Sequence, residues 1–142
     1  MNFRTVALLL FFCGQCFVVS APVAESQETE AATRQYAVAV GFQNQKLYDT
    51  AIDEWKTFLK KYPEDARGDV ANHYLGTCCL QEKRYPEAIA AFSTVISKFP
   101  DGKLLPQSML NLGIAHYATA QKSGLQDDYA KAEASLGQML AK

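Results

Sequence analysis

The sequence predicts an all-α solenoid of about three stacked helical hairpins, and two observations support this prediction. The first is a repeat: Lys-Tyr-Pro at 61–63 returns 37 residues later as Lys-Phe-Pro at 98–100, and an Ala-x3-aromatic motif precedes both copies by the same interval. A fixed period of this size is typical of stacked supersecondary units. The second is that no stretch alternates strictly between apolar and polar residues beside hairpin turn signals, so nothing predicts strands.

Residues 1–24 are predicted to be a secretory signal peptide. Arg4 is a short basic region, residues 6–12 (VALLLFF) are an apolar core, and small residues follow at Ser20 and Ala24, where we expect cleavage. An uncleaved membrane anchor is the alternative. Residues 25–31 carry three glutamates and are expected to be an acidic spacer before the first helix.

Helices are then expected at 31–44, 48–61, 68–82, 86–98, 105–121 and 127–141. They pair into three repeats, at about 32–68, 69–105 and 106–142, of which the last is incomplete. Pro63 and Pro100 follow the second helix of the first two hairpins, because proline cannot continue a helix. Pro86 suits the first turn of a helix, where no hydrogen bond is lost.

Equivalent residues recur at matching places in the three repeats. They are Val38-Ala39-x2-Phe42, Tyr48, Ala51, Trp55 and Pro63 in repeat one, Leu75-Gly76-x2-Cys79, Tyr85, Ala88, Phe92 and Pro100 in repeat two, and Leu112-Gly113-x2-His116, Tyr129, Ala132 and Leu136 in repeat three. This pattern resembles the tetratricopeptide repeat (TPR), with its L-G-x2-Y, A-x3-F and P positions. The resemblance covers about residues 32–142 and implies a TPR-like α-solenoid.

Small residues are expected to let the two helices of each hairpin approach closely. Ala39, Gly76 and Gly113 hold this position in the first helices. A glycine inside a helix costs about 1 kcal/mol relative to alanine, so its use here indicates packing. Trp55 and Phe92 are expected to fill the space beside these contacts in successive hairpins.

The third repeat departs from the other two in its spacing. Gly76 and Ala88 are 12 residues apart, but Gly113 and Ala132 are 19 apart, so about seven residues are inserted around 121–127. We expect them in a loop, which is either a lengthened turn without a role or part of a binding surface. No polar capping helix follows this hairpin. The chain is therefore interpreted either as the repeat region of a larger protein, with an enzymatic or other activity downstream of residue 142, or as a stack whose last face a partner or second copy covers.

No pattern in the sequence predicts a catalytic, cofactor-binding or metal site. There is no nucleophile motif and no glycine-rich phosphate loop. Cys79 and His116, at equivalent positions of adjacent repeats, are the pair that would suggest metal or redox chemistry, but buried structural roles are favoured. The net charge is −1 without a basic stretch, so no nucleic-acid partner is predicted. No small-molecule substrate is expected either.

The TPR resemblance implies a partner-binding concave face, lined by residues of the first helices that do not pack on the second ones. Carried over by position, its nine residues are Tyr36, Val40, Gln43, His73, Thr77, Leu80, Leu110, Ile114 and Tyr117. Each set of three follows i, i+4, i+7 and so shares one helix face. Their aromatic, aliphatic and amide groups suit a peptide or a partner helix.

The leader and repeats together resemble exported bacterial envelope proteins with TPRs, of the outer-membrane assembly lipoprotein and Tol–Pal coordinator types. The resemblance implies a non-enzymatic scaffold for protein–protein interaction. It is expected to be periplasmic or envelope-associated if the source is bacterial, and otherwise secreted. Membrane contact is expected only through an uncleaved leader.

Overall fold

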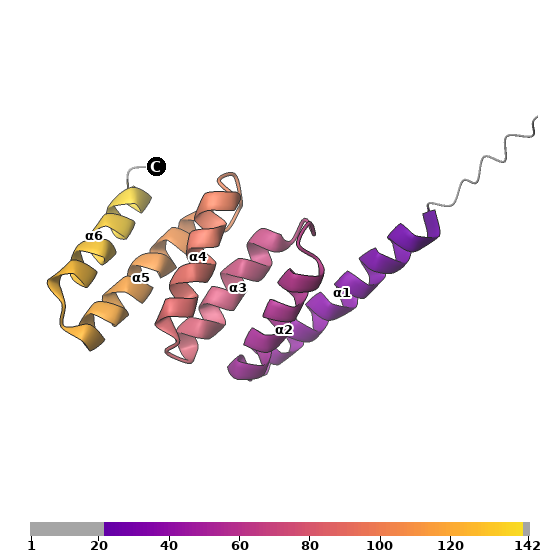
Figure 1. Ribbon diagram of the computed structural model, residues 1–142, viewed down its shortest axis with the longest axis horizontal. Helices are drawn as coiled ribbons and strands as arrows, with labels where there is room; N and C mark the ends of the chain where they lie inside the picture. Colours follow the sequence, from indigo (N-terminus) through magenta and orange to yellow (C-terminus); the bar gives the residue numbers. More distant parts are fainter. Residues whose placement is uncertain (1–21, 141–142) are drawn as a thin grey trace, which may run out of the picture.

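The computed structural model describes residues 22–140, and this part of the chain is all helical. The six helices are α1 (Pro22–Asn44), α2 (Tyr48–Lys61), α3 (Gly68–Gln81), α4 (Tyr85–Lys98), α5 (Leu105–Ser123) and α6 (Gln126–Leu140). Each helix packs against the next one in the chain, so they form a row of three antiparallel hairpins (Figure 1). The predicted all-α solenoid of three helical hairpins is confirmed. Residues 1–21, which hold most of the predicted signal peptide, lie outside the described part.

The first helix begins earlier than predicted. α1 starts at Pro22, so residues 25–31, expected to be an acidic spacer, are helical. Glutamate, glutamine and alanine dominate this stretch and are good helix formers. Arg34 adds an i, i+4 ion pair to Glu30, with both side chains two-thirds exposed.

The inserted residues of repeat three lengthen a helix and do not form a loop. α5 has 19 residues, whereas α3 has 14, and only two residues separate α5 from α6. Alanine, glutamine and lysine in its last two turns favour the extension. Gly124 then ends the helix in the left-handed conformation, with φ of 70°, and its N–H bonds the carbonyl of Ala120. The loop expected around 121–127 is therefore wrong in extent, because only residues 124 and 125 lie between the two helices.

Close approach within the hairpins depends on the glycines that the repeat pattern singled out. A Cβ atom added to Gly76 would lie 2.7 Å from the ring of Phe92, and one added to Gly113 would lie 2.5 Å from Leu136. Phe92 and Leu136 occupy matching repeat positions. The expected pairing of a small residue on the first helix with a large one on the second is thus confirmed in both hairpins.

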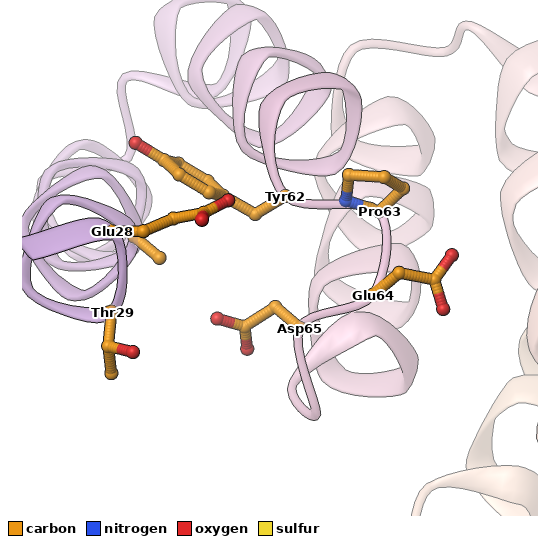
Figure 2. A pocket seen from close by; sticks show the side chains of 7 residues that line it. Glu28, Thr29, Tyr62, Pro63, Glu64 and Asp65 are labelled. Carbon is orange, nitrogen blue, oxygen red and sulfur yellow. The ribbon is translucent and has the colours of Figure 1, made fainter. Parts of the chain in front are cut away.

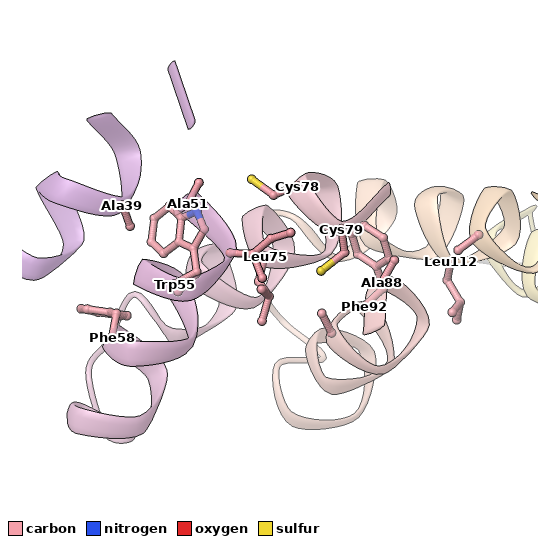
Figure 3. Close-up of a cluster of buried hydrophobic side chains, with 14 of the residues drawn as sticks. Ala39, Ala51, Trp55, Phe58, Leu75, Cys78, Cys79, Ala88, Phe92 and Leu112 are labelled. Atoms are coloured by element: carbon pink, nitrogen blue, oxygen red, sulfur yellow. The ribbon is translucent and has the colours of Figure 1, made fainter. Parts of the chain in front are cut away.

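A continuous apolar core runs through the seams between helices. Trp55 and Phe92 are fully buried, as are Ala51 and Ala88, which stand four residues before them (Figure 3). Trp55 contacts three further rings: Tyr36 and Phe58 edge-on, and Tyr74 of the next hairpin in a stacked arrangement. Burying such rings is a large part of the stabilisation that a small helical repeat has available.

Candidate partner-binding face

The first three residues of the predicted concave face lie on α1, where their own hairpin and the next one engage them. Tyr36 packs edge-on against Trp55, with ring centroids 5.1 Å apart, and the Arg67 guanidinium lies 4.8 Å from the Tyr36 centroid. The Gln43 side-chain oxygen accepts a 3.0 Å hydrogen bond from the Trp55 indole N–H. Val40 is half-buried against the core. These side chains serve folding as well as any binding role.

The three residues on α3 are also engaged, and His73 among them contacts α5. His73 is buried, and its Nδ1 lies 2.8 Å from the hydroxyl oxygen of the fully buried Ser108. Burial lowers the pKa of His73, because the charged imidazolium would lose its hydration, and Asp69 opposes this shift. The Thr77 hydroxyl donates to the backbone carbonyl of His73, and Leu80 packs half-buried against the core.

The three residues on α5 are open to solvent. Leu110, Ile114 and Tyr117 are 41%, 46% and 49% exposed, and we call these three residues the α5 stripe. The Tyr117 ring packs edge-on against Tyr129 of α6, with centroids 5.9 Å apart. Exposed large apolar side chains that share one face mark an interaction surface more often than isolated ones do. The α5 stripe is therefore the part of the predicted face that is free to bind.

Charged contacts join the first hairpin to the second. Glu87 of α4 accepts hydrogen bonds from Arg84 and from Lys56 of α2, and these lower the pKa of Glu87 to about 2. Arg84 also reaches Asp49 of α2, at 3.4 Å. The groups are partly exposed, so each pair contributes little stability on its own. Among the described residues, no ion pair joins the second hairpin to the third, where the His73–Ser108 contact is the polar link.

An acid-lined hollow of about 330 Å³ lies between the start of α1 and the turn after α2. Figure 2 shows Glu28 and Thr29 on one wall and Tyr62, Pro63, Glu64 and Asp65 on the other. Asp65 already accepts two hydrogen bonds from the Arg67 guanidinium, which lower the pKa of that carboxyl. The hollow was not predicted from the sequence, because residues 25–31 were expected to be a spacer.

The residues weighed for metal chemistry have different surroundings. Burial raises the pKa of the Cys78 thiol to about 12 and that of Cys79 to about 11, so neither is a ready thiolate. The charges that act on Cys79 come from α2 and α4, whereas those that act on His116 come from α6. Within residues 22–140 there is no group of three or more potential metal ligands. None of the helices in this range combines the length and the apolar character needed to cross a bilayer.

Comparison with protein families bears on the second repeat. A family model described as tetratricopeptide repeat matches residues 71–102. This segment is similar to a tetratricopeptide repeat. It comprises most of α3, all of α4 and the following turn, and it contains the Gly76–Phe92 contact. The TPR fold is typically a non-catalytic scaffold, and TPRs generally mediate protein–protein interaction. A search of curated proteins found no match to the chain.

Proposed function

We propose that this protein is an exported, non-enzymatic scaffold of the cell envelope that binds a protein partner through the α5 stripe. The observation that carries the binding site is the exposure of Leu110, Ile114 and Tyr117 at repeat positions where the other two hairpins have buried or half-buried residues. The export and the envelope location rest on the leader-like residues 1–24 and on the family resemblance. The other six predicted residues, on α1 and α3, make contacts within the protein and so hold the helices in place.

The chemistry of the α5 stripe favours an apolar helix as its occupant. Two aliphatic side chains and one tyrosine stand at i, i+4 and i+7, the spacing that contacts a helix packed alongside. Lysine, asparagine and arginine, which would clamp a peptide carboxylate, are absent from these three positions. Specificity is therefore expected to come from shape and apolar contact.

The test places a photo-crosslinking amino acid at position 114 in cells that express the full sequence. A covalent adduct between this chain and another polypeptide is expected in the envelope fraction. The crosslinker at position 47 is the matched control, because Leu47 is equally exposed but lies at the α1–α2 turn, outside the stripe. Absence of any position-114 adduct would contradict the binding site. N-terminal sequencing of the purified protein tests cleavage near Ser20 or Ala24, and an intact Met1 would contradict it.

The alternative, that the activity of the whole protein lies downstream of residue 142, stays a prediction. The coding sequence after Lys142 tests it directly.

A further inference from the structure

Three polar contacts between successive hairpins share one sequence separation. Asp49 contacts Arg84, Gln43 contacts Cys78 and His73 contacts Ser108, and each pair is 35 residues apart. Other contacts across the seam between the first two hairpins have different separations, such as Lys56 with Glu87. The separation of 35 is two residues short of the 37-residue repeat. For the first helices, where two of the three contacts lie, a side chain therefore finds a neighbour on the first helix of the next hairpin at position i+35.

The same separation can be applied beyond the third hairpin. A hairpin that followed the third one would be offset from repeat one by three repeats of 37 residues, which is 111 residues. A residue i of the third hairpin would pair with position i+35 in that next hairpin. This position is equivalent to residue i−76 in repeat one. The α5 stripe then pairs with three residues of α1: Leu110 with Arg34, Ile114 with Val38, and Tyr117 with Gly41. We call Arg34, Val38 and Gly41 the α1 face.

The α1 face is open in the single chain. Val38 is 43% exposed, whereas the equivalent Leu75 is 9% exposed in repeat two. A Cβ atom at Gly41 would meet nothing within 4 Å, whereas the equivalent Cys78 is fully buried. Inside the stack, the preceding hairpin covers these positions. One end of the row therefore presents the α5 stripe and the other end presents the α1 face. These are the two halves of the interface that is repeated inside the stack.

The two halves also match in size and polarity. Exposed Ile114 would meet exposed Val38, an apolar pair. Tyr117, the largest side chain of the α5 stripe, would meet Gly41, where no side chain stands in its way. The stem of Arg34 would cover Leu110 while its charged group stays in water beside Glu30.

From this continuity we propose that the α5 stripe binds the α1 face of a second copy of this chain, so that copies stack head to tail and extend the solenoid. This inference rests on the proposed function and names the partner of the same site. The interface is heterologous: the two surfaces differ, and each copy keeps one free half, so the assembly is open-ended. Three side chains on each surface are few for a stable complex, so the association should be weak and should depend on concentration.

The test uses protein purified from cells that express the full sequence, studied by sedimentation velocity at increasing concentration. The parent protein should show a series of species larger than the monomer. Ile114→Asp removes one half of the interface and Val38→Asp the other, and both positions are exposed enough to tolerate the change. Each variant alone should remain a monomer at concentrations where the parent associates. Leu47→Asp is the control and should associate as the parent does.

An equimolar mixture of Ile114→Asp and Val38→Asp gives the decisive result. Each variant retains the half that the other has lost, so the mixture should form one-to-one dimers and nothing larger. Dimers of Val38→Asp alone would show a symmetric stripe-to-stripe contact and would overturn the head-to-tail proposal. A parent that stays monomeric throughout would overturn self-association, while an adduct at position 114 with a different protein would leave the proposed function intact. A crosslinker at position 117 should attach to α1 of the second copy near residue 41.

Discussion

The first two hairpins and the third use the same helix positions for different purposes. Tyr36 is surrounded by two aromatic rings and a guanidinium, and His73 is buried against Ser108, while Leu110, at the equivalent position, faces solvent. Part of the difference lies within the first hairpin, because Trp55 and Phe58 of α2 pack against Tyr36. The rest comes from the neighbour, because the third hairpin supplies the Ser108 that contacts His73. In a stack, a residue's repeat position decides its orientation, and its place in the row decides its exposure.

The largest expected effect contrasts position 36 with position 110. Tyr36→Ala should lower the free energy of unfolding by about 2–3 kcal/mol, since it removes two edge-on ring contacts and the support for Arg67. Leu110→Ala should change it by less than about 0.5 kcal/mol, as expected for an exposed side chain. Urea unfolding followed by circular dichroism measures both. Equal losses of unfolding free energy would mean that Leu110 is as well covered as Tyr36. The contrast between the first hairpin and the third would then disappear.

A smaller effect on stability is expected when alanine replaces a glycine at a close contact between helices and a glycine at an open site. Gly76→Ala should destabilise the protein by about 1–2 kcal/mol, because the new Cβ would lie 2.7 Å from the buried Phe92 ring and overpacking outweighs the gain in helix propensity. Gly41→Ala adds the same atom where nothing lies within 4 Å, so it should stabilise the protein by up to about 1 kcal/mol. Thermal unfolding of the two variants side by side checks the sign. If both variants became more stable, the helices at Gly76 would have room to separate.

The smallest expected effect concerns pH and the contact between the second and third hairpins. Burial lowers the pKa of His73 below its ordinary 6.5, so the unfolded chain takes up this proton at a higher pH than the folded protein does. The stability that neutral His73 contributes is therefore complete above about pH 6.5 and is lost as the pH falls through the folded pKa. Between about pH 7.5 and 5, the free energy of unfolding should fall more steeply in the parent than in His73→Gln.

His116 complicates this measurement because its pKa is also lowered by burial. His116→Gln in the His73→Gln background separates the two contributions. If His73→Gln left the pH dependence unchanged, the histidine would be protonated as easily in the folded protein as in the unfolded one.

The architecture could be predicted from the repeat, and the exceptions have clear physical reasons. The Ala-x3-aromatic and proline positions placed α2 and α4 within a residue of their observed bounds. Residues 25–31 are polar enough to indicate a solvated spacer, yet their helix propensity extends α1. The extra residues before Gly124 were assigned to a loop, although most of them favour a helix.

The binding face could be predicted only as a set of positions. Periodicity identifies which residues share a helix face, but it does not show which of them another helix covers. The bond from Trp55 to Gln43 and the contact of His73 with Ser108 depend on the distance between neighbouring helices. The separation of 35 residues that Gln43–Cys78 and His73–Ser108 share becomes visible only in the folded structure.

The extended α1 has a mechanical consequence. It is nine residues longer than α2, which corresponds to about 13 Å of helix at its N-terminal end, and it lies at the opposite end of the row from α5 and α6 (Figure 1). A tether that joins before Pro22 and a load attached to Ile114 would pull on the molecule in series, through both seams between hairpins. Among the described residues, only the seam between the first two hairpins carries ion pairs, so salt should weaken that seam and leave the His73–Ser108 seam unchanged.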